Sequence, residues 1–407
     1  MAREAMHYQE LEELAMQWKG KVCIVGAGMI GKTWGYDLVT AAGFEVDFYY
    51  DNHIPANRVI LHDISTISFE EMLSYQDHIL IWVAASEKNK WRLELQLKNA
   101  GFTNIIILDY ILLHEVCESV LETKNTYVHT KYQNIVDDTI FLKRQFAYRV
   151  GYQLNLDEPK TLNEKLQWLK LYDRKAIYTT MVDKYEVKDY VANLIGEEYI
   201  IPTIAVLNDF DSIDVNQLPQ QFVIKCTHDS GSVIVCKDKT DFDWHGARQK
   251  IERALKRNFY WVGREWPYKN VIPRIMIEQY LADCEYEVLP VYKFFCFSGK
   301  PELVQLIQND KQSDECVDFY DLEWNKLELQ QIYPNSSGIA NKPEQLEEMI
   351  QLATRLSAGY SFIRIDFYVV NGQVKFSEYT FYTDSGFGKL KPEDWDWKLG
   401  EKIMIGG

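Results

Sequence analysis

The chain has 407 residues, of which 47% are hydrophobic and 14% aromatic, so it can build two or three domains. Its formal net charge of −16 argues against nucleic acid or an anionic membrane as the main partner, because these require clustered Lys and Arg. The seven cysteines form no CxxC pair, and no apolar run approaches the roughly 18 residues of a membrane-spanning helix. We expect a cytoplasmic protein without a signal peptide.

The first part of the chain alternates between strand and helix patterns. Strands are expected at residues 22–25, 46–50, 79–83 and 105–108, with helices up to residue 42 and from 86 to 100. Such alternation with short links predicts a parallel, doubly wound sheet. We expect a Rossmann-like domain over residues 1–115, followed by a helical connector over residues 116–150.

The first turn of this domain reads Gly26-Ala27-Gly28-Met29-Ile30-Gly31, which fits the GxGxxG fingerprint. Asp51 ends the second strand, where dinucleotide-binding sheets carry a ribose-binding acid. The run to Lys32-Thr33 also fits a GxxxxGK[ST] phosphate loop, but no later strand ends in a clear Mg-binding Asp, which favours the Rossmann interpretation. The glycines also suit a tight turn without a ligand. A nucleotide or sugar-nucleotide site at Gly26, Gly28, Gly31 and Asp51 and a structural or partner-docking role both stay open.

From about residue 151 the pattern changes. The strand at 222–226 carries Lys225, and a small polar loop, 227–232, follows it. A lysine beside a Gly/Ser loop can place a cation and backbone N–H groups around a polyphosphate, although such a hairpin is more often structural. The apolar strand at 274–281 carries Glu278, and Glu285 follows seven residues later. These acids could meet an adenine amino group and a ribose hydroxyl, or lie solvated on the surface.

Near the end of the chain, Arg364-Ile365-Asp366 and Glu378-Tyr379-Thr380 flank the turn pair Asn371-Gly372. A plain two-residue turn would pair Asp366 with residue 377 and send Glu378 to the wrong face. A three-residue connection or one bulge would place Asp366 opposite Glu378 and Arg364 opposite Thr380. On that condition the hairpin predicts a site for Mg-bound phosphate, because carboxylates suit Mg²⁺ and arginine is a forked donor. Otherwise it is an edge hairpin with solvated charges.

Taken in order, these features resemble the ATP-grasp superfamily, in which ATP lies between two α+β subdomains. The chain more closely resembles the teichuronopeptide-biosynthesis (TupA-like) branch, which is found with bacterial capsule and cell-wall polysaccharide genes. That resemblance rests on the segments Asn163-Glu164-Lys165-Leu166, Asp183-Lys184-Tyr185, 222–225, 228–231 and 292–299. It covers about residues 140–402 and implies an ATP-grasp region over 151–407, with subdomains at about 183–281 and 282–407.

The resemblance also implies a role for each matching residue. ATP would be bound by Lys184, Lys225, His228, Ser230, Gly231, Ser232, Glu278, Gln279, Leu281, Glu285 and Lys293. Within this set, residues 230–232 would form a flexible lid, Glu278, Gln279 and Leu281 the adenine hinge, and Glu285 the ribose contact. Mg²⁺ would be held by Asp366, Glu378 and Thr380, although many relatives carry asparagine where Thr380 stands. Arg364 would be catalytic and stabilise charge on an acyl phosphate.

The activity implied by the resemblance is ATP-dependent ligation of a carboxylate to an amine through an acyl phosphate. ATP and Mg²⁺ would be the cofactors. The partners would be a small carboxylate, such as a uronic acid or its nucleotide sugar, and an amino acid or small amine, in capsule or cell-surface polysaccharide biosynthesis. The alternatives are an ATP-grasp kinase acting on a small sugar or amine metabolite, and a glycosyltransferase of the same pathway.

Overall fold

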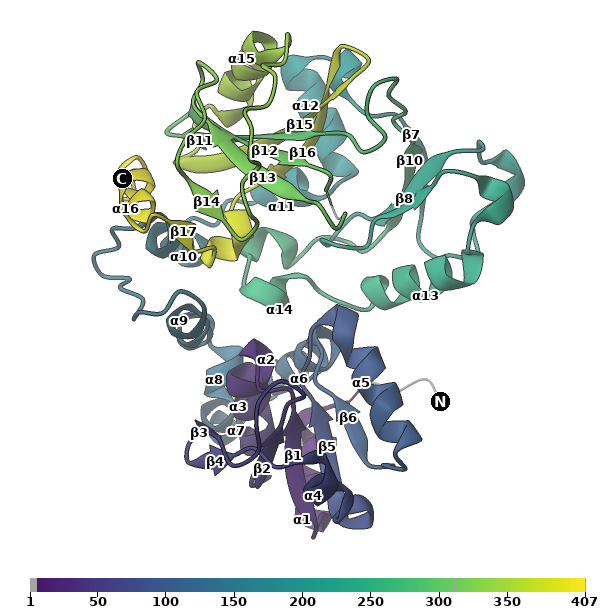
Figure 1. Ribbon diagram of the computed structural model, residues 1–407, viewed down its shortest axis with the longest axis vertical. Coiled ribbons are helices and arrows are strands. Elements are labelled where there is room, and N and C mark those ends of the chain that lie inside the picture. Colours follow the sequence, from purple (N-terminus) through teal and green to yellow (C-terminus); the bar gives the residue numbers. More distant parts are fainter. Residues whose placement is uncertain (1–5, 311, 407) are drawn as a thin grey trace. The chain divides into compact units, whose positions relative to one another are not determined.

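The computed structural model describes residues 6–310 and 312–406 and divides into two compact units, Met1–Gln153 (unit 1) and Leu154–Gly407 (unit 2) (Figure 1). No helix in the described ranges is long and apolar enough to span a membrane.

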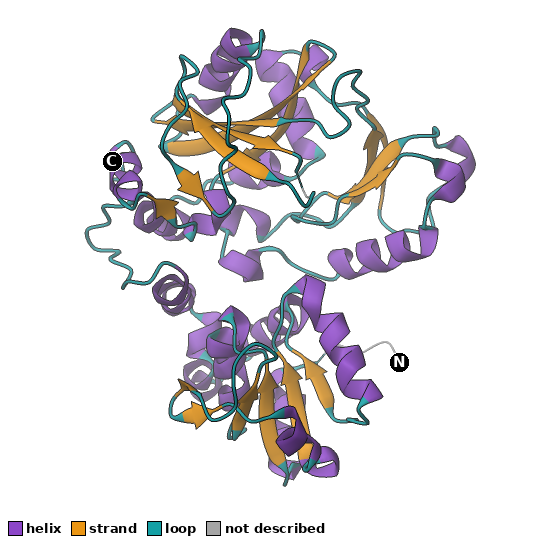
Figure 2. Ribbon diagram, viewed as in Figure 1, coloured by secondary structure: helices purple, strands orange, loops and turns teal. Residues whose placement is uncertain are grey.

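Unit 1 is built on a parallel four-stranded sheet with the order β2-β1-β5-β6 (Figure 2). Its strands are β1 (Lys21–Val25), β2 (Phe48–Tyr50), β5 (Ile79–Val83) and β6 (Ile105–Ile107). All of β5 is buried, as expected for a central strand of a parallel sheet that is covered on both faces. The alternating pattern predicted this parallel sheet, and the structure confirms it.

One predicted helix of unit 1 is split in the structure. The helices of this unit are α1 (Tyr8–Gln17), α2 (Met29–Lys32), α3 (Trp34–Ala41), α4 (Phe69–Leu73), α5 (Glu87–Asn99), α6 (Tyr110–Glu122), α7 (Thr126–Lys131), α8 (Gln133–Val136) and α9 (Asp138–Arg149). The helix expected up to residue 42 is split, because Thr33 between α2 and α3 has non-helical angles (φ −121°, ψ −115°). A short hairpin of β3 (Val59–Leu61) and β4 (Ile64–Ser65) was not predicted. Arg144 of α9 pairs with Asp37 of α3 at 2.7 Å, so α9 is joined to α3 within unit 1.

The described part of unit 2 contains two larger antiparallel sheets and one two-stranded sheet. The smaller sheet has the order β7-β10-β8-β9 and comprises β7 (Thr203–Leu207), β8 (Phe222–Cys226), β9 (Ile234–Cys236) and β10 (Ile275–Gln279). The larger sheet has the order β13-β12-β11-β15-β16 and comprises β11 (Val291–Phe297), β12 (Lys300–Gln308), β13 (Cys316–Tyr320), β15 (Phe362–Val370) and β16 (Gln373–Thr380). A separate two-stranded sheet pairs β14 (Gln330–Gln331) with β17 (Leu390–Lys391).

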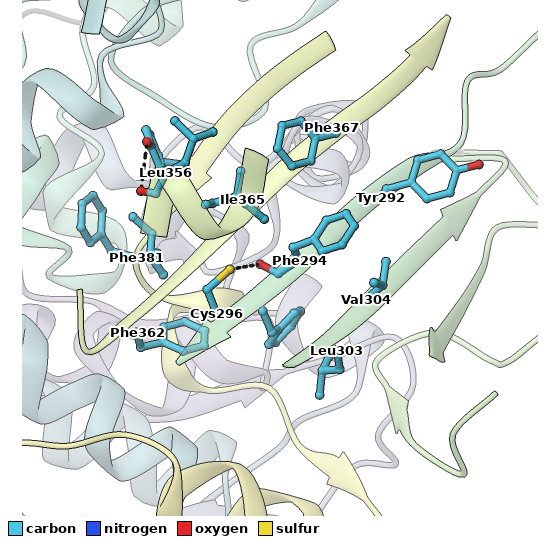
Figure 3. Close-up of a cluster of buried hydrophobic side chains, with 14 of the residues drawn as sticks. Tyr292, Phe294, Cys296, Leu303, Val304, Leu356, Phe362, Ile365, Phe367 and Phe381 are labelled. Atoms are coloured by element: carbon cyan, nitrogen blue, oxygen red, sulfur yellow. Dashed lines mark hydrogen bonds between the residues drawn. The ribbon is translucent and has the colours of Figure 1, made fainter. Parts of the chain in front are cut away.

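Each sheet of unit 2 has its own helical cover. The helices of unit 2 are α10 (Leu162–Tyr172), α11 (Ile177–Val182), α12 (Glu186–Ile195), α13 (Trp244–Leu255), α14 (Tyr260–Gly263), α15 (Leu346–Ser357) and α16 (Asp394–Glu401). Ile224 and Ile277 of the smaller sheet share a core with α13. Phe294 and Phe367 of the larger sheet share a core with Leu356 of α15 (Figure 3). The smaller sheet buries the face that carries Ile224 and Ile277, whereas the larger sheet has buried side chains on both faces, including Phe294 on one and Phe295 on the other.

The β15–β16 hairpin contains the bulge on which the predicted metal site depends. Asn371 and Gly372 form a two-residue turn with φ of 48° and 79°, the positive values that a type I′ turn requires. Farther from the turn, the pairing shifts by one residue between Asp366 and Phe367. This shift places Asp366 opposite Glu378, and two residues on, position 364 pairs with position 380. The required register is therefore produced by a bulge and not by a longer turn.

The segment Asn163-Glu164-Lys165-Leu166 fixes helix α10 within unit 2. Thr161 and Glu164 form a capping box at its start. Asn163 is buried and donates from Nδ2 to the Gly388 carbonyl at 2.9 Å and to Asp396 Oδ2 at 3.0 Å. This segment, which contributed to the family resemblance, is architectural in the structure.

Replacing Asn163 by alanine is expected to lower the stability of unit 2 by about 2 kcal/mol, because it leaves buried acceptors without a donor. Asn193→Ala is the matched control. Its Nδ2 donates to the Asp189 carbonyl on the exposed side of α12, so its loss should cost no more than about 0.5 kcal/mol. Thermal unfolding measures the difference, and MgATP affinity should be the same in both variants. Equal melting temperatures would contradict the assigned role of Asn163.

Candidate functional site

Arg364 and Asp366 form a buried ion pair on β15. They lie two residues apart on one face of the strand, so the guanidinium can lie along the carboxylate. Arg364 donates from Nε to Oδ1 and from Nη2 to Oδ2 of Asp366, each at 2.8 Å, and the side chains are 8% and 1% exposed. Burial acts against both charges, but the opposite charges outweigh it, so the pKa of Arg364 is raised and the pKa of Asp366 is lowered. Both groups are therefore charged.

Two hydroxyls and a second carboxylate complete the surroundings of Arg364. The guanidinium donates to Thr380 Oγ1 at 3.0 Å and to Thr383 Oγ1 at 3.2 Å. Its Nη2 lies 3.7 Å from Glu378 Oε1. Thr380, predicted as a metal ligand, thus directs its oxygen to Arg364. The guanidinium is held in one orientation beside the carboxylates, as electrostatic preorganisation requires.

Asp366 and Glu378 are the carboxylates of this cluster that could hold a metal ion. Asp366 Oδ2 also lies 3.3 Å from Lys293 Nζ of the neighbouring strand β11, whereas Glu378 is 42% exposed and accessible to a ligand. Across residues 6–310 and 312–406, no group of three or more His, Cys, Asp and Glu side chains is placed to hold a metal. Two carboxylates nevertheless fit Mg²⁺, which one or two side chains can hold together with substrate phosphates and water.

The segment after β16 bends sharply beside this cluster. Asp384 (φ 46°, ψ 32°) and Ser385 (φ 54°, ψ 28°) both adopt left-handed angles. Helix α10 supports the bend, because Lys170 Nζ donates to the Ser385 carbonyl at 2.7 Å and Gln167 Nε2 donates to the next carbonyl at 2.6 Å. Left-handed angles at non-glycine residues cost about 1–3 kcal/mol each and concentrate at functional sites. No pattern in the sequence predicted this bend.

On the smaller sheet, Glu278 lies between two lysines. Its Oε1 is 2.5 Å from Lys188 Nζ, and its Oε2 pairs with Lys225 Nζ. Burial would raise the pKa of Glu278, but the two lysines lower it below its ordinary value, while burial lowers the pKa of Lys188. The structure thus joins the predicted Lys225 and Glu278. Lys188 was not predicted from the sequence as a site residue, although it follows the predicted Lys184 by four residues.

An apolar strip lies beside Glu278 on the same face of the smaller sheet. Val223 of β8 is opposite Glu278, and Val235 of β9 is opposite Val223, so the three side chains point to one side. Val235 is 47% exposed although it is a β-branched apolar residue in a strand. An exposed apolar surface next to a polar group suits a flat heteroaromatic ring such as adenine. The sequence analysis did not identify either valine.

The loop between β8 and β9 has a fixed base and an exposed tip. Asp229 is fully buried, and its carboxylate lies 2.6 Å from both Ser232 Oγ and Arg257 Nη2. Ser230 and Gly231 at the tip are exposed, and the space around the Gly231 α-carbon is empty to 4 Å on its side-chain side. These two predicted lid residues are therefore accessible to a ligand, whereas Ser232 is part of the base.

His228 and Lys184 each form a hydrogen bond that fixes this loop. The His228 ring is buried, and its Nε2 contacts the carbonyl oxygens of Ala254 and Arg257 at 3.1 and 3.0 Å, so it anchors the loop to the end of α13. Burial lowers its pKa. Lys184 Nζ donates to the Asp229 carbonyl. The predicted ligand role of His228 therefore does not extend to Nε2, which is occupied by backbone.

Lys184 is electrostatically coupled both to this loop and to the β15–β16 hairpin. Burial lowers the pKa of its ammonium group, and the negative charges of Glu378 and Asp229 oppose that effect. The same two carboxylates and Arg364 act on the pKa of Tyr268, which burial raises strongly. The loop after β8 and the hairpin of the larger sheet thus both carry charges that act on the pKa values of Lys184 and Tyr268.

MgATP affinity is expected to fall at alkaline pH earlier than an ordinary lysine would allow. Lys184 starts to lose its proton below its usual pKa of 10.5, and the phosphate contact that the family resemblance implies for Lys184 requires the charged form. The Kd should therefore rise as the pH increases through this lowered pKa, by about tenfold once the charge is lost. Calorimetry between pH 7 and 10 tests this. Lys184→Arg keeps its charge and should weaken the dependence, and a flat wild-type profile would contradict it.

The segment after β10 contacts the turn of the β15–β16 hairpin. Asp283 Oδ2 accepts from the Asn371 backbone N–H at 2.6 Å, and Asn371 Nδ2 donates to the Ala282 carbonyl at 3.0 Å. Glu285 follows, and its side chain is exposed. Asn371 therefore has a role besides turn formation, since it ties the predicted ribose acid to the predicted Mg²⁺ hairpin.

The other hinge residues are placed by the end of β10. The Gln279 backbone N–H donates to the Pro202 carbonyl at 3.0 Å while its side chain is exposed, and Leu281 is half-buried.

The four predicted residues of unit 1 form a separate group. Gly26, Gly28 and Asp51 line a cavity of that unit, and Gly31 is not part of the lining.

A family model described as TupA-like ATP-grasp matches residues 164–404, which is more than half of the chain. No curated protein matches the chain. Among solved structures, D-alanyl-alanine synthetase A of Vibrio cholerae O1 biovar eltor is 11% identical with a TM-score of 0.31, over 50% of this chain and 56% of that chain. This chain thus aligns with little more than half of that protein's length.

Two further solved structures are similar over most of this chain. The D-alanine-D-alanine ligase of Helicobacter pylori is 13% identical with a TM-score of 0.32, over 95% of this chain and 100% of that chain. The L-amino acid ligase of Bacillus licheniformis is 9% identical with a TM-score of 0.31, over 91% and 69%. Because these identities and TM-scores are low, the family assignment rests on the match to the family model. That match confirms the resemblance predicted from the sequence. The chain belongs to the TupA-like ATP-grasp family.

Proposed function

We propose that the protein is an ATP-dependent ligase that joins a carboxylate to an amine through an acyl phosphate. The observation that carries this proposal is the fixed guanidinium of Arg364 next to Asp366 and Glu378, on the face of the larger sheet that also carries Lys293. Acyl-phosphate chemistry develops negative charge on phosphoryl and carbonyl oxygens, and a preorganised cation stabilises it.

The ATP site is proposed to span both sheets of unit 2. Adenine would lie on the strip of Val223 and Val235 beside Glu278, within reach of the backbone at 279–281. The phosphates would meet Lys184, Lys225 and Lys293, with the exposed tip at 230–231 covering them and Glu285 near the ribose. This arrangement uses the accessible parts of the loop and hinge described above.

Asp366 and Glu378 would hold Mg²⁺, which when bound supplies positive charge to the phosphate oxygens. The Arg364 and Lys293 side chains hold the Asp366 carboxylate in place. Glu378 is the more exposed of the two carboxylates and can turn toward a ligand. Two carboxylate donors therefore suit an ion whose remaining ligands come from the substrate and water.

Two displacements account for the proposed reaction. A substrate carboxylate oxygen attacks the γ-phosphorus of ATP, the bond between that phosphorus and the β,γ-bridging oxygen breaks, and ADP leaves. An amine nitrogen then attacks the acyl carbon and loses a proton, and the bond from carbon to phosphate oxygen breaks to release phosphate. Arg364 stabilises the charge in both steps, and the covering loop keeps water from hydrolysing the intermediate.

The substrate class is proposed from the family. Membership of the TupA-like family supports a uronic acid of a polysaccharide, or its nucleotide sugar, as the carboxylate, and an amino acid or small amine as its partner. The product would enter a capsule or another cell-surface polysaccharide. A cytoplasmic site of action is proposed because the reaction consumes ATP and all seven cysteines are free thiols.

A hydroxylamine trap tests this proposal without knowledge of the amine. The full chain is incubated with MgATP, hydroxylamine and a panel of uronic acids and nucleotide-linked uronic acids, and ADP and hydroxamate are measured. Equal yields of ADP, phosphate and hydroxamate with one carboxylate support the ligase. A phosphorylated sugar or amine without free phosphate would identify a kinase instead, and no ADP from any member of the panel would contradict the substrate class.

A further inference from the structure

Unit 1 contains a cavity of about 460 Å³ at the carboxyl ends of its parallel strands. Its lining includes residues that follow each strand: Gly26 after β1, Asp51 after β2, Ala84 after β5 and Leu108 after β6. Strands β1 and β5 lie side by side in the sheet (Figure 1), and the chain leaves them in opposite directions along the strand order. This is the switch point at which open α/β sheets bind ligands. The volume lies within the roughly 300–1,000 Å³ of small-molecule sites.

The three glycines of the first turn have different reasons to be glycine. Gly26 has φ of 107°, and a β-carbon there would lie 2.2 Å from the Ala84 carbonyl oxygen. At Gly31 a β-carbon would lie 2.1 Å from the Gly26 carbonyl oxygen. Gly28 has an ordinary φ of −86°, and no atom lies within 4 Å of the position of its β-carbon. The fold therefore requires glycine at 26 and 31, whereas at 28 the missing side chain only leaves space in the cavity.

The two carboxylates of the cavity are engaged by the protein itself. Asp51 accepts backbone N–H groups from Ala27 at 3.0 Å and from His53 at 2.9 Å. Asp109 Oδ1 accepts two N–H groups at the start of α6, and its Oδ2 lies 3.1 Å from Lys90. Their negative charges are thus partly compensated within the protein. This is not the arrangement of a cation site.

Arg92 provides a positive charge to the same cavity. It lies on α5 and lines the cavity together with Asn89 and Ser86. In the part of the chain that the structure describes, its exposed side chain has no hydrogen bond or ion pair. A cation without a partner, near an open backbone position at Gly28, selects for an anion that carries several acceptor oxygens.

The remaining walls suit a ring and a sugar. Tyr50 and Tyr110 contribute aromatic side chains, while Asn52 and His53, which follow β2, contribute polar groups. Tyr50 is fixed by its hydroxyl, which lies 2.7 Å from Asn52 Oδ1. The cavity therefore combines a cationic side chain with aromatic and polar walls.

We propose that this cavity is a second ligand site, which binds the nucleoside diphosphate part of a nucleotide or nucleotide sugar. The phosphates lie against the Gly28 backbone and Arg92, and the nucleoside lies toward Tyr50, Asn52 and His53. The site lies wholly within unit 1, so it stands independently of the proposed ligase activity of unit 2.

Calorimetry of the full chain with ADP, GDP, CDP and UDP tests this site. At least one of these probes should bind, and Arg92→Ala should weaken that binding by about tenfold or more. Gly28→Leu should abolish it by filling the cavity while the fold is kept, since nothing occupies the space that its side chain enters. Lys98→Ala is the matched control on α5. Its side chain is 59% exposed, pairs with Glu94 and does not line the cavity, so binding should be unchanged.

Lys225→Ala separates the two sites of the chain. Binding to unit 1 should persist in this variant, whatever its effect on MgATP binding to unit 2. Absence of binding by all four diphosphates would overturn the inference. It would also be overturned by binding that is lost in Lys225→Ala and unchanged in Arg92→Ala and Gly28→Leu, because the probe would then occupy unit 2.

Discussion

Replacing Arg364 by alanine is expected to lower turnover at saturating ATP by about 100- to 1,000-fold, and MgATP affinity far less. In the proposed mechanism the guanidinium acts mainly on charge that develops in the transition state, so its loss should appear in kcat. Steady-state kinetics and calorimetry with MgATP measure the two quantities. Lost nucleotide binding with normal turnover at saturating ATP would make Arg364 a ground-state phosphate anchor.

Arg364→Lys is the control for folding. Arg364→Ala removes the main partner of the buried Asp366 and is expected to destabilise the protein by about 3–5 kcal/mol. Lysine keeps the positive charge but lacks the planar fork that bonds both oxygens of the carboxylate. The lysine variant should therefore fold better than the alanine variant and still turn over slowly. Recovery of full activity in Arg364→Lys would show that charge alone is sufficient.

Asp366→Asn and Glu378→Gln are each expected to lower Mg²⁺-dependent turnover by about 100-fold or more, because each removes a charge from the proposed metal site. Their effects on stability should differ. Asp366 is 1% exposed and paired with Arg364, so its replacement should also cost about 3–5 kcal/mol of unfolding free energy. Glu378 is 42% exposed, so Glu378→Gln should cost about 0.5 kcal/mol or less.

Kinetics over a range of Mg²⁺ concentrations and thermal unfolding without nucleotide measure these effects. Glu401→Gln is the matched control. It removes an exposed carboxylate from the end of α16, outside the β15–β16 hairpin, and should leave both quantities unchanged. Normal Mg²⁺ dependence in Glu378→Gln would contradict its assignment as a ligand.

The sequence predicts those parts of the fold that depend on local patterns. The parallel sheet of unit 1 follows from buried apolar runs separated by helices, and β5 has the predicted bounds of 79–83. The split at Thr33 was not predicted, because a single residue with non-helical angles leaves the pattern of apolar residues unchanged. The β15–β16 hairpin follows from Asn371-Gly372, but its bulge is set by packing farther along the strands. The sequence therefore predicted the hairpin but not its register, which depends on the bulge.

The candidate site was predicted in part for a similar reason. Lys225 and Glu278 were selected separately, whereas their ion pair and the presence of Lys188 depend on how β8, β10 and α12 come together. The same holds for Asn371 and Asp283, which are 88 residues apart in the chain. The His228 ring, which was predicted to contact ATP, bonds to the end of α13 through its Nε2. Side-chain contacts between distant segments are not encoded in local periodicity.

The most direct test of the ligase mechanism uses a carboxylate substrate labelled with ¹⁸O in its carboxyl group. Attack of a carboxylate oxygen on the γ-phosphorus transfers that oxygen to the phosphate when the amide forms. We expect one ¹⁸O atom in each phosphate released, measured by mass spectrometry after a reaction with MgATP and an amine. Phosphate without ¹⁸O, with both labelled atoms still in the organic product, would contradict the acyl-phosphate mechanism.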